Sequence, residues 1–160
     1  MLVSSIFFLI ITGFSNIVTQ VLLLRELLVN FQGNELTLGI ILGNWVIAAA
    51  IGAYLARRSS REKPNLLILL QFLFAAILPL SIYFCRVSKT AFGIQPGEGV
   101  SLWFIFLVSL LAVLPLAMRS GALFSICASF FGSIARVYTA EVCGMILGGI
   151  TATYLFYTAF

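Results

Sequence analysis

Nearly the whole of this 160-residue chain is taken up by five long apolar stretches joined by short connections. A helix that crosses a bilayer needs about 20 mostly apolar residues, and inside the bilayer its backbone amides must be hydrogen-bonded within the protein. The stretches cover residues 3–31, 35–56, 65–85, 101–132 and 138–160. They predict an all-α fold, a polytopic membrane helix bundle of about five transmembrane helices forming one integral-membrane domain over residues 1–160.

The composition supports the same class. Hydrophobic residues make up 62% of the chain and charged residues only 9%, which lies far outside the usage of soluble domains. We expect that little of the chain is left for a soluble domain.

Positive charge predicts the orientation of the helices, since cytoplasmic loops retain lysine and arginine. The connection 57–63 holds four cations and one anion, so we place it in the cytoplasm and expect the chain in the inner membrane of a bacterium. Alternation then puts the amino terminus inside, the loop 86–100 outside and the carboxyl terminus outside. For a net charge of +4, anionic membrane lipids are a simpler partner than nucleic acid.

The sequence gives little indication of a cofactor or metal site. The sequence has no histidine, the side chain on which many haem and metal sites depend. Cys85, Cys127 and Cys143 show no C-x-x-C spacing, so we interpret them as packing residues. We therefore expect no cofactor, no metal and no catalytic residue.

The first helix carries a polar stripe. Thr12, Asn16 and Gln20 recur every four residues, with Ser15 and Thr19 beside them. Lipid cannot satisfy an amide, so these side chains either hydrogen-bond to other helices or line a path for a solute.

Small residues at four-residue intervals let helix backbones approach closely in a membrane. Gly39 and Gly43 form such a pair in the second helix, and Gly144 and Gly148 lie in a longer series in the fifth. The spacing predicts helix packing at these four glycines.

The fourth stretch is longer than the hydrocarbon core requires. Pro115 lacks a backbone donor, which predicts a kinked fourth helix with carbonyl groups near Leu111 freed from the helix. Such groups are available to a ligand, a water molecule or another helix.

Two ionisable residues lie within apolar runs, where a charge costs several kcal/mol unless it is paired or hydrated. We predict that these residues, Arg119 and Glu141, approach one another, either as a structural ion pair or as part of a site for a charged solute. With Asn16, Gln20 and Asn44 they form the candidate buried polar site. A second pair, Arg25 with Glu35, is expected to close the outer end of the first hairpin.

Several of these motifs resemble the multi-helix membrane module of spermidine synthase-like proteins. The matching residues are Gly13-Phe14-Ser15, Gln20, Arg25-Glu26-Leu27, Gly33-Asn34-Glu35-Leu36, Gly39, Asn44-Trp45, residues 119–124 and residues 137–149. In that family the module precedes an aminopropyltransferase domain with a glycine-rich nucleotide loop and acidic polyamine ligands. Neither feature follows the helices here, so the resemblance implies a truncated member or a stand-alone membrane module that is not an enzyme.

Three functions remain open at this stage. The first is a non-catalytic module or subunit that packs with other transmembrane subunits or as a homo-oligomer. The second is a transporter-like fragment for a small charged solute such as a polyamine. The third is a quinone- or lipid-binding accessory subunit of a membrane electron-transfer complex, for which aromatic residues, 14% of the chain, provide material.

Overall fold

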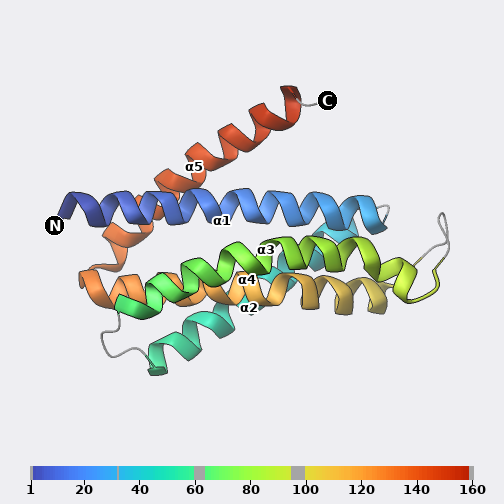
Figure 1. Ribbon diagram of the computed structural model, residues 1–160, viewed down its shortest axis with the longest axis horizontal. Coiled ribbons are helices and arrows are strands. Elements are labelled where there is room, and N and C mark those ends of the chain that lie inside the picture. The colour runs from blue at the N-terminus through green and yellow to red at the C-terminus, as the bar shows by residue number, and fades with distance from the viewer. Residues whose placement is uncertain (1, 32, 60–63, 95–99, 159–160) are drawn as a thin grey trace. The chain divides into compact units, whose positions relative to one another are not determined.

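The computed structural model describes residues 2–31, 33–59, 64–94 and 100–158, and these are almost entirely helical. The helices, labelled in Figure 1, are α1 (Leu2–Phe31), α2 (Glu35–Ser59), α3 (Pro64–Ala91), α4 (Leu102–Phe131) and α5 (Ile134–Thr158). The predicted all-α fold is confirmed.

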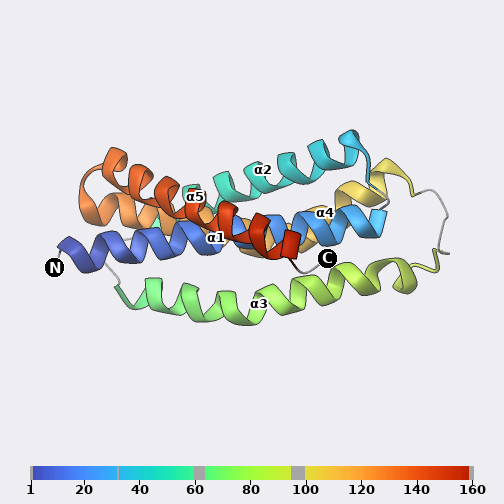
Figure 2. The same cartoon turned by 90° about the horizontal axis from the view of Figure 1, so that it is seen from above.

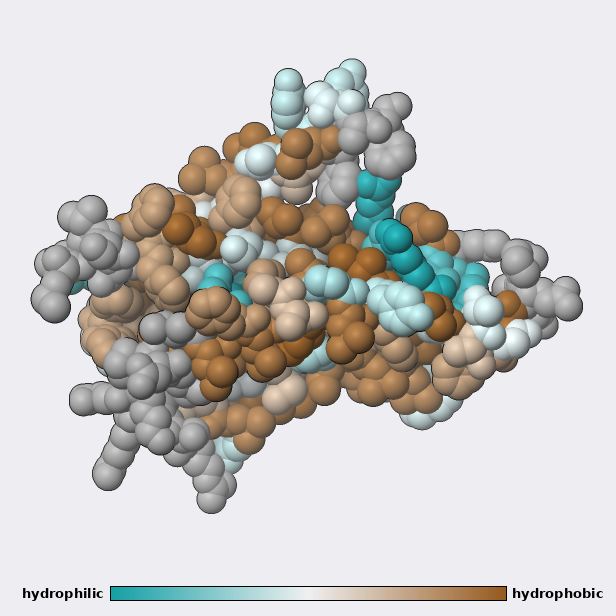
Figure 3. All heavy atoms as spheres, viewed as in Figure 1, coloured by the Kyte–Doolittle hydropathy of each residue, from teal (hydrophilic) through white to brown (hydrophobic). Residues whose placement is uncertain are grey.

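All five helices contain a stretch long and apolar enough to cross a membrane. The stretches are Ile6–Phe31, Glu35–Arg57, Leu69–Ala91, Leu102–Phe131 and Ile134–Leu155. Large apolar side chains such as Phe72, Trp103 and Ile150 are exposed on these helices, and apolar surface dominates the face drawn in Figure 3. A surface of this kind suits lipid rather than water, and the chain is an integral membrane protein.

Short local signals set the ends of the helices. The Asn34 side chain accepts a 3.0 Å hydrogen bond from the Thr37 amide and so caps the start of α2. Gly132, with φ of 62°, follows the last residue of α4 in the left-handed conformation that commonly ends a helix. These caps keep the connections α1–α2 and α4–α5 short.

Two boundaries differ from the prediction by about a helical turn or more. Helix α3 continues to Ala91 rather than ending at Cys85, because Arg86 and Ser88 bond to side chains of α1 instead of starting a loop. Helix α5 begins at Ile134 rather than Tyr138. Most of the predicted basic connection and the glycine-rich part of the outer loop, residues 60–63 and 95–99, lie outside the described residues.

The chain forms two compact units. Unit 1 comprises Met1–Leu22 and Ile126–Phe160, and unit 2 comprises Leu23–Ser125. Helices α1 and α4 run through both units without a break, so the units do not correspond to successive segments of the chain. The single domain stays a prediction.

Unit 2 holds the larger core. Its fully buried members include Leu23 and Leu27 of α1, Ile41 of α2 and Leu116 of α4. Helix α4 lies between α2 and α3 in the view of Figure 2. Pro115 is accommodated within α4, which is assigned as helix from Leu102 to Phe131, so any bend there is not a break.

Unit 1 combines a crossing of α1 and α5 with the last residues of α4. Helix α5 crosses the first part of α1, and the two diverge beyond that point (Figure 1). A Cβ atom on Gly13 would collide with the Glu141 carbonyl group, and one on Gly144 with the Ile10 carbonyl group. The glycines therefore permit direct contact between the two backbones.

Candidate functional site

The polar centre of unit 1 is a hydrogen bond beside the helix crossing. Asn16 Nδ2 donates to Glu141 Oε1 over 2.9 Å, and the two residues are only 4% and 6% exposed. A carboxyl group at this depth needs polar partners, since lipid offers none. Asn16 provides one of them from the facing helix. The predicted stripe on α1 thus meets a predicted site residue of α5.

The other members of the stripe behave differently. The hydroxyl groups of Thr12, Ser15 and Thr19 donate to carbonyl groups of α1 itself, one turn earlier. These hydroxyl groups donate within their own helix, because a hydroxyl on a helix can reach the carbonyl four residues back. Gln20 is half-buried at the end of the stripe.

Arg119 is held by α3 within unit 2. Its Nη2 donates to Gln71 Oε1, its Nε donates to the Leu70 carbonyl oxygen over 3.3 Å, and its guanidinium group lies 4.1 Å from the centre of the Phe74 ring. The side chain is 5% exposed. Amide, carbonyl and aromatic face together offset much of the cost of burying this charge.

The expected approach of Arg119 to Glu141 stays a prediction, because Arg119 belongs to unit 2 and Glu141 to unit 1. The interactions of Arg119 described above all come from α3, a helix that sequence reasoning did not consider as its partner. The sequence feature that could have indicated α3 as the partner is Gln71, a lone amide in an apolar run.

Asn44 forms a separate polar contact in unit 2. Its Nδ2 donates to Ser109 Oγ over 2.8 Å and to the Phe106 carbonyl oxygen over 3.0 Å. Ser109 and Arg119 are ten residues apart on α4, which corresponds to about 15 Å along a helix axis. Asn44 and Arg119 therefore serve two distinct contacts of α4, one with α2 and one with α3.

An ion pair ties α1 to α3 in unit 2. Arg86 Nη2 donates to Glu26 Oε1 over 2.6 Å and Arg86 Nε to Glu26 Oε2 over 2.9 Å, which makes the pair bidentate. One turn further along α1, Asn30 donates to Ser88 Oγ and to the Cys85 carbonyl oxygen. This pairing was missed because residue 86 was assigned to a loop. The Arg25–Glu35 pair stays a prediction.

The predicted packing glycines fall into two groups. Gly144 and Gly148 lie against α1, where a Cβ would meet atoms of Ile10, Phe14 or Ile17. Gly39 and Gly43 are exposed, and a Cβ on either would meet no other described atom within 4 Å. Their role in helix packing stays a prediction, because no described part of this chain packs against them.

A glycine contact that was not predicted joins α2 to α4 in unit 2. A Cβ on Gly52 would collide with the Met118 carbonyl group, and one on Gly121 with the Ala49 carbonyl group. The sequence signal was present, since Gly52 and Gly121 both stand in series of small residues.

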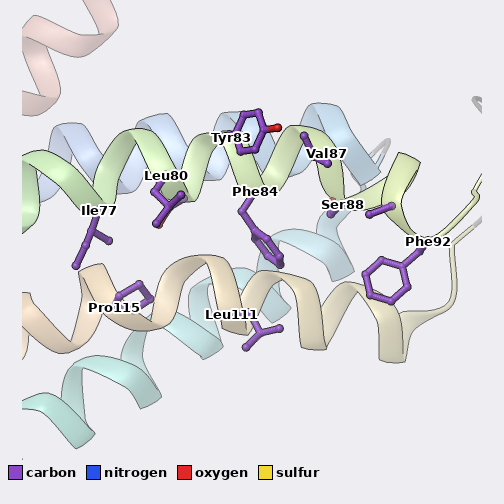
Figure 4. A pocket seen from close by; sticks show the side chains of 11 residues that line it. Ile77, Leu80, Tyr83, Phe84, Val87, Ser88, Phe92, Leu111 and Pro115 are labelled. Atoms are coloured by element: carbon purple, nitrogen blue, oxygen red, sulfur yellow. The ribbon is translucent and has the colours of Figure 1, made fainter.

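An apolar groove of about 520 Å³ runs between α3 and α4 in unit 2. Figure 4 shows Leu80 and Phe84 of α3 pointing toward α4, with Phe92 at the far end. Its walls offer contacts for a hydrocarbon chain. Ser88, which also lines it, already donates its hydroxyl hydrogen to the Cys85 carbonyl oxygen.

Potential metal ligands are scattered. Among the described residues no group of three or more histidine, cysteine, aspartate or glutamate side chains lies close enough together to hold an ion. The three cysteines are free thiols; Cys85 and Cys127 are buried and Cys143 is exposed.

Comparison of the chain with protein-family models, with curated proteins and with solved structures finds no match. The resemblance to spermidine synthase-like membrane modules therefore stays a prediction.

Proposed function

We propose that the chain is a non-catalytic integral-membrane module that packs with further transmembrane helices, either other subunits or copies of itself. The contrast between its glycines carries this proposal. Gly52, Gly121 and Gly144 stand in series of small residues and each contacts a neighbouring backbone, whereas Gly39 and Gly43 have the same kind of spacing and contact nothing described. A series of this kind goes with a helix contact at those three glycines, and the exposed pair on α2 has no such contact among the described residues.

The buried polar groups support the same proposal. Asn44, Asn30 and Arg119 each bond to a neighbouring helix, which is the use that membrane helices make of polar side chains in packing. The α3–α4 groove is lined mostly by hydrocarbon side chains and does not resemble a polar path through the membrane.

The proposed location is the cytoplasmic membrane of a bacterium, with the amino terminus inside and the carboxyl terminus outside. The support is the charge pattern: Arg57 ends the second span, and Arg58, Arg61 and Lys63 follow it in the sequence before the third, where positive residues mark the cytoplasmic side.

The test is the mass of the particle that a mild detergent extracts from the native membrane. Gly43→Ile places a branched side chain on the exposed glycine face of α2, and Ala76→Ile adds the same kind of bulk on an exposed position of α3. We expect the wild type and Ala76→Ile to be extracted with a protein mass well above 17.5 kDa, and Gly43→Ile to be extracted alone. A wild-type particle of one chain would contradict the proposal. An aminopropyltransferase-like polypeptide among the partners would support the family resemblance.

One observation favours a second function, transport of a small cationic solute such as a polyamine. Glu141 places a carboxyl group in the membrane interior beside Asn16, and a carboxylate is the natural ligand of an amine. Proteoliposomes containing only this chain would then take up a labelled diamine. Glu141→Gln would abolish uptake, whereas Glu26→Gln, at the separate pair with Arg86, would preserve it. Absence of uptake by the wild type would remove this alternative.

A further inference from the structure

A second groove, in unit 1, combines apolar walls with a cation at one end. It has a volume of about 490 Å³ and lies between the first turns of α1 and of α5, a size typical of small-molecule sites. Ile6, Leu9 and Ile10 form the α1 wall, and Ala140 and Cys143 part of the α5 wall. We call it the α1–α5 groove.

The cation is Arg136, which lines the groove from the third residue of α5. Its side chain is exposed, and no ion pair engages it within the described part of unit 1. It lies at the start of the span Ile134–Leu155, the depth at which lipid headgroups begin. The first turn of α5 adds backbone donors and the positive end of the helix dipole.

One end of the groove is therefore cationic and the rest is apolar. This matches the charged headgroup and the apolar acyl chains of an anionic phospholipid. The amino-terminal ends of α1 and α5 lie at the same end of unit 1 in both views (Figures 1 and 2). A chain entering from that end meets Arg136 first and then the apolar side chains toward Cys143.

We propose that the α1–α5 groove binds one anionic phospholipid, with its phosphate at Arg136 and an acyl chain along the apolar walls. The exposed arginine beside the apolar walls argues for an anionic headgroup with an acyl chain rather than for a helix of a second copy. The α3–α4 groove of Figure 4 has a similar volume but no cation in its lining, so it serves as an internal comparison. The proposal goes beyond the packing function and does not depend on it.

The test uses a single tryptophan in each groove and lipids with brominated acyl chains, which quench it on contact. Trp45 and Trp103, the two native tryptophans, are replaced by phenylalanine, and the reporter is Phe131→Trp in the α1–α5 groove or Phe84→Trp in the α3–α4 groove. The full chain is reconstituted with brominated phosphatidylglycerol or brominated phosphatidylcholine. One interfacial arginine favours an anionic lipid by about fivefold, which we expect at Phe131→Trp and not at Phe84→Trp.

Substitutions of two arginines test whether Arg136 causes the preference for phosphatidylglycerol. Arg136→Gln should bring the phosphatidylglycerol preference at Phe131→Trp close to one, and Arg57→Gln, which removes an exposed arginine from the end of α2, should leave it unchanged. Added salt should weaken the preference, because an exposed charge pair is screened. Since a reporter variant can fail to fold, native mass spectrometry of the otherwise unaltered chain gives a second measurement. Its retained phosphatidylglycerol should fall in Arg136→Gln alone.

Two outcomes would overturn the proposal. Equal quenching by both lipids at Phe131→Trp in the wild-type background would mean that the groove contacts the surrounding lipid without selecting an anionic headgroup. Quenching by neither, together with a dimeric chain, would mean that a second copy covers the groove.

Discussion

Asn16 and Glu141, 125 positions apart in the sequence, share a 2.9 Å hydrogen bond at the crossing of α1 and α5. The bond joins the polar stripe of the first helix to the carboxyl group of the last. Because Gly13 and Gly144 bring the two backbones into contact on the same faces, polar and steric complementarity act together here.

Replacing Asn16 with leucine, which is of similar size, should destabilise unit 1. The variant removes a donor from a buried carboxyl group, and a hydrogen bond between membrane helices contributes about 0.6 to 2 kcal/mol. The free energy of unfolding in bicelles measures the loss. Thr19→Val is the matched control, since the Thr19 hydroxyl bonds within its own helix. An equal loss in both variants would contradict the assigned role of the Asn16–Glu141 bond.

Two glycines of α5 offer a comparison that isolates the crossing. A methyl group on Gly144 would collide with the Ile10 carbonyl group, whereas one on Gly149 would meet no described atom within 4 Å. Gly144→Ala should therefore cost about 1 to 3 kcal/mol, the usual penalty for overpacking, and Gly149→Ala should leave the free energy of unfolding almost unchanged. Equal tolerance of both substitutions would show that α1 and α5 do not touch at Gly144.

The number and type of the helices followed from the sequence, because the length of an apolar stretch is a property of neighbouring residues. Local caps were equally readable: Asn34 and Gly132 act within a few residues of their own positions. The limit was reached at the end of α3. Arg86 and Lys89 there resemble the polar start of a loop, yet Arg86 is paired with a residue of α1.

Partners between helices were harder to predict for the same reason. Asn16 and Glu141 were recognised as residues that need partners, but the apolar pattern does not specify which helix faces which. Arg119 shows the difficulty most clearly, since it contacts Gln71, Leu70 and Phe74 of α3, and none of these uncharged residues was considered as its partner. Charge complementarity directed attention to Glu141, and that approach stays a prediction.

The two charges of the Glu26–Arg86 pair should be exchangeable between their positions. Arg86 is 67% exposed, so the pair is open to screening. Glu26→Gln and Arg86→Gln should each lower the melting temperature slightly at low salt, with a smaller effect at high salt. The double exchange Glu26→Arg with Arg86→Glu should recover the wild-type value. Failure of the exchange, with both single variants destabilised, would mean that the two side chains act independently.

The central claim is that α2 presents its Gly39 and Gly43 face to another transmembrane helix. The most direct test is photo-crosslinking in the native membrane from a cysteine at position 43, carrying a short photoactivatable label, in a chain whose exposed native thiol is removed by Cys143→Ser. The same label at position 76 of α3 is the control. We predict that label 43 forms an adduct with a transmembrane segment of another subunit or another copy, and that label 76 reacts with lipid. If label 43 also reacts only with lipid, the α2 face has no partner and the claim is contradicted.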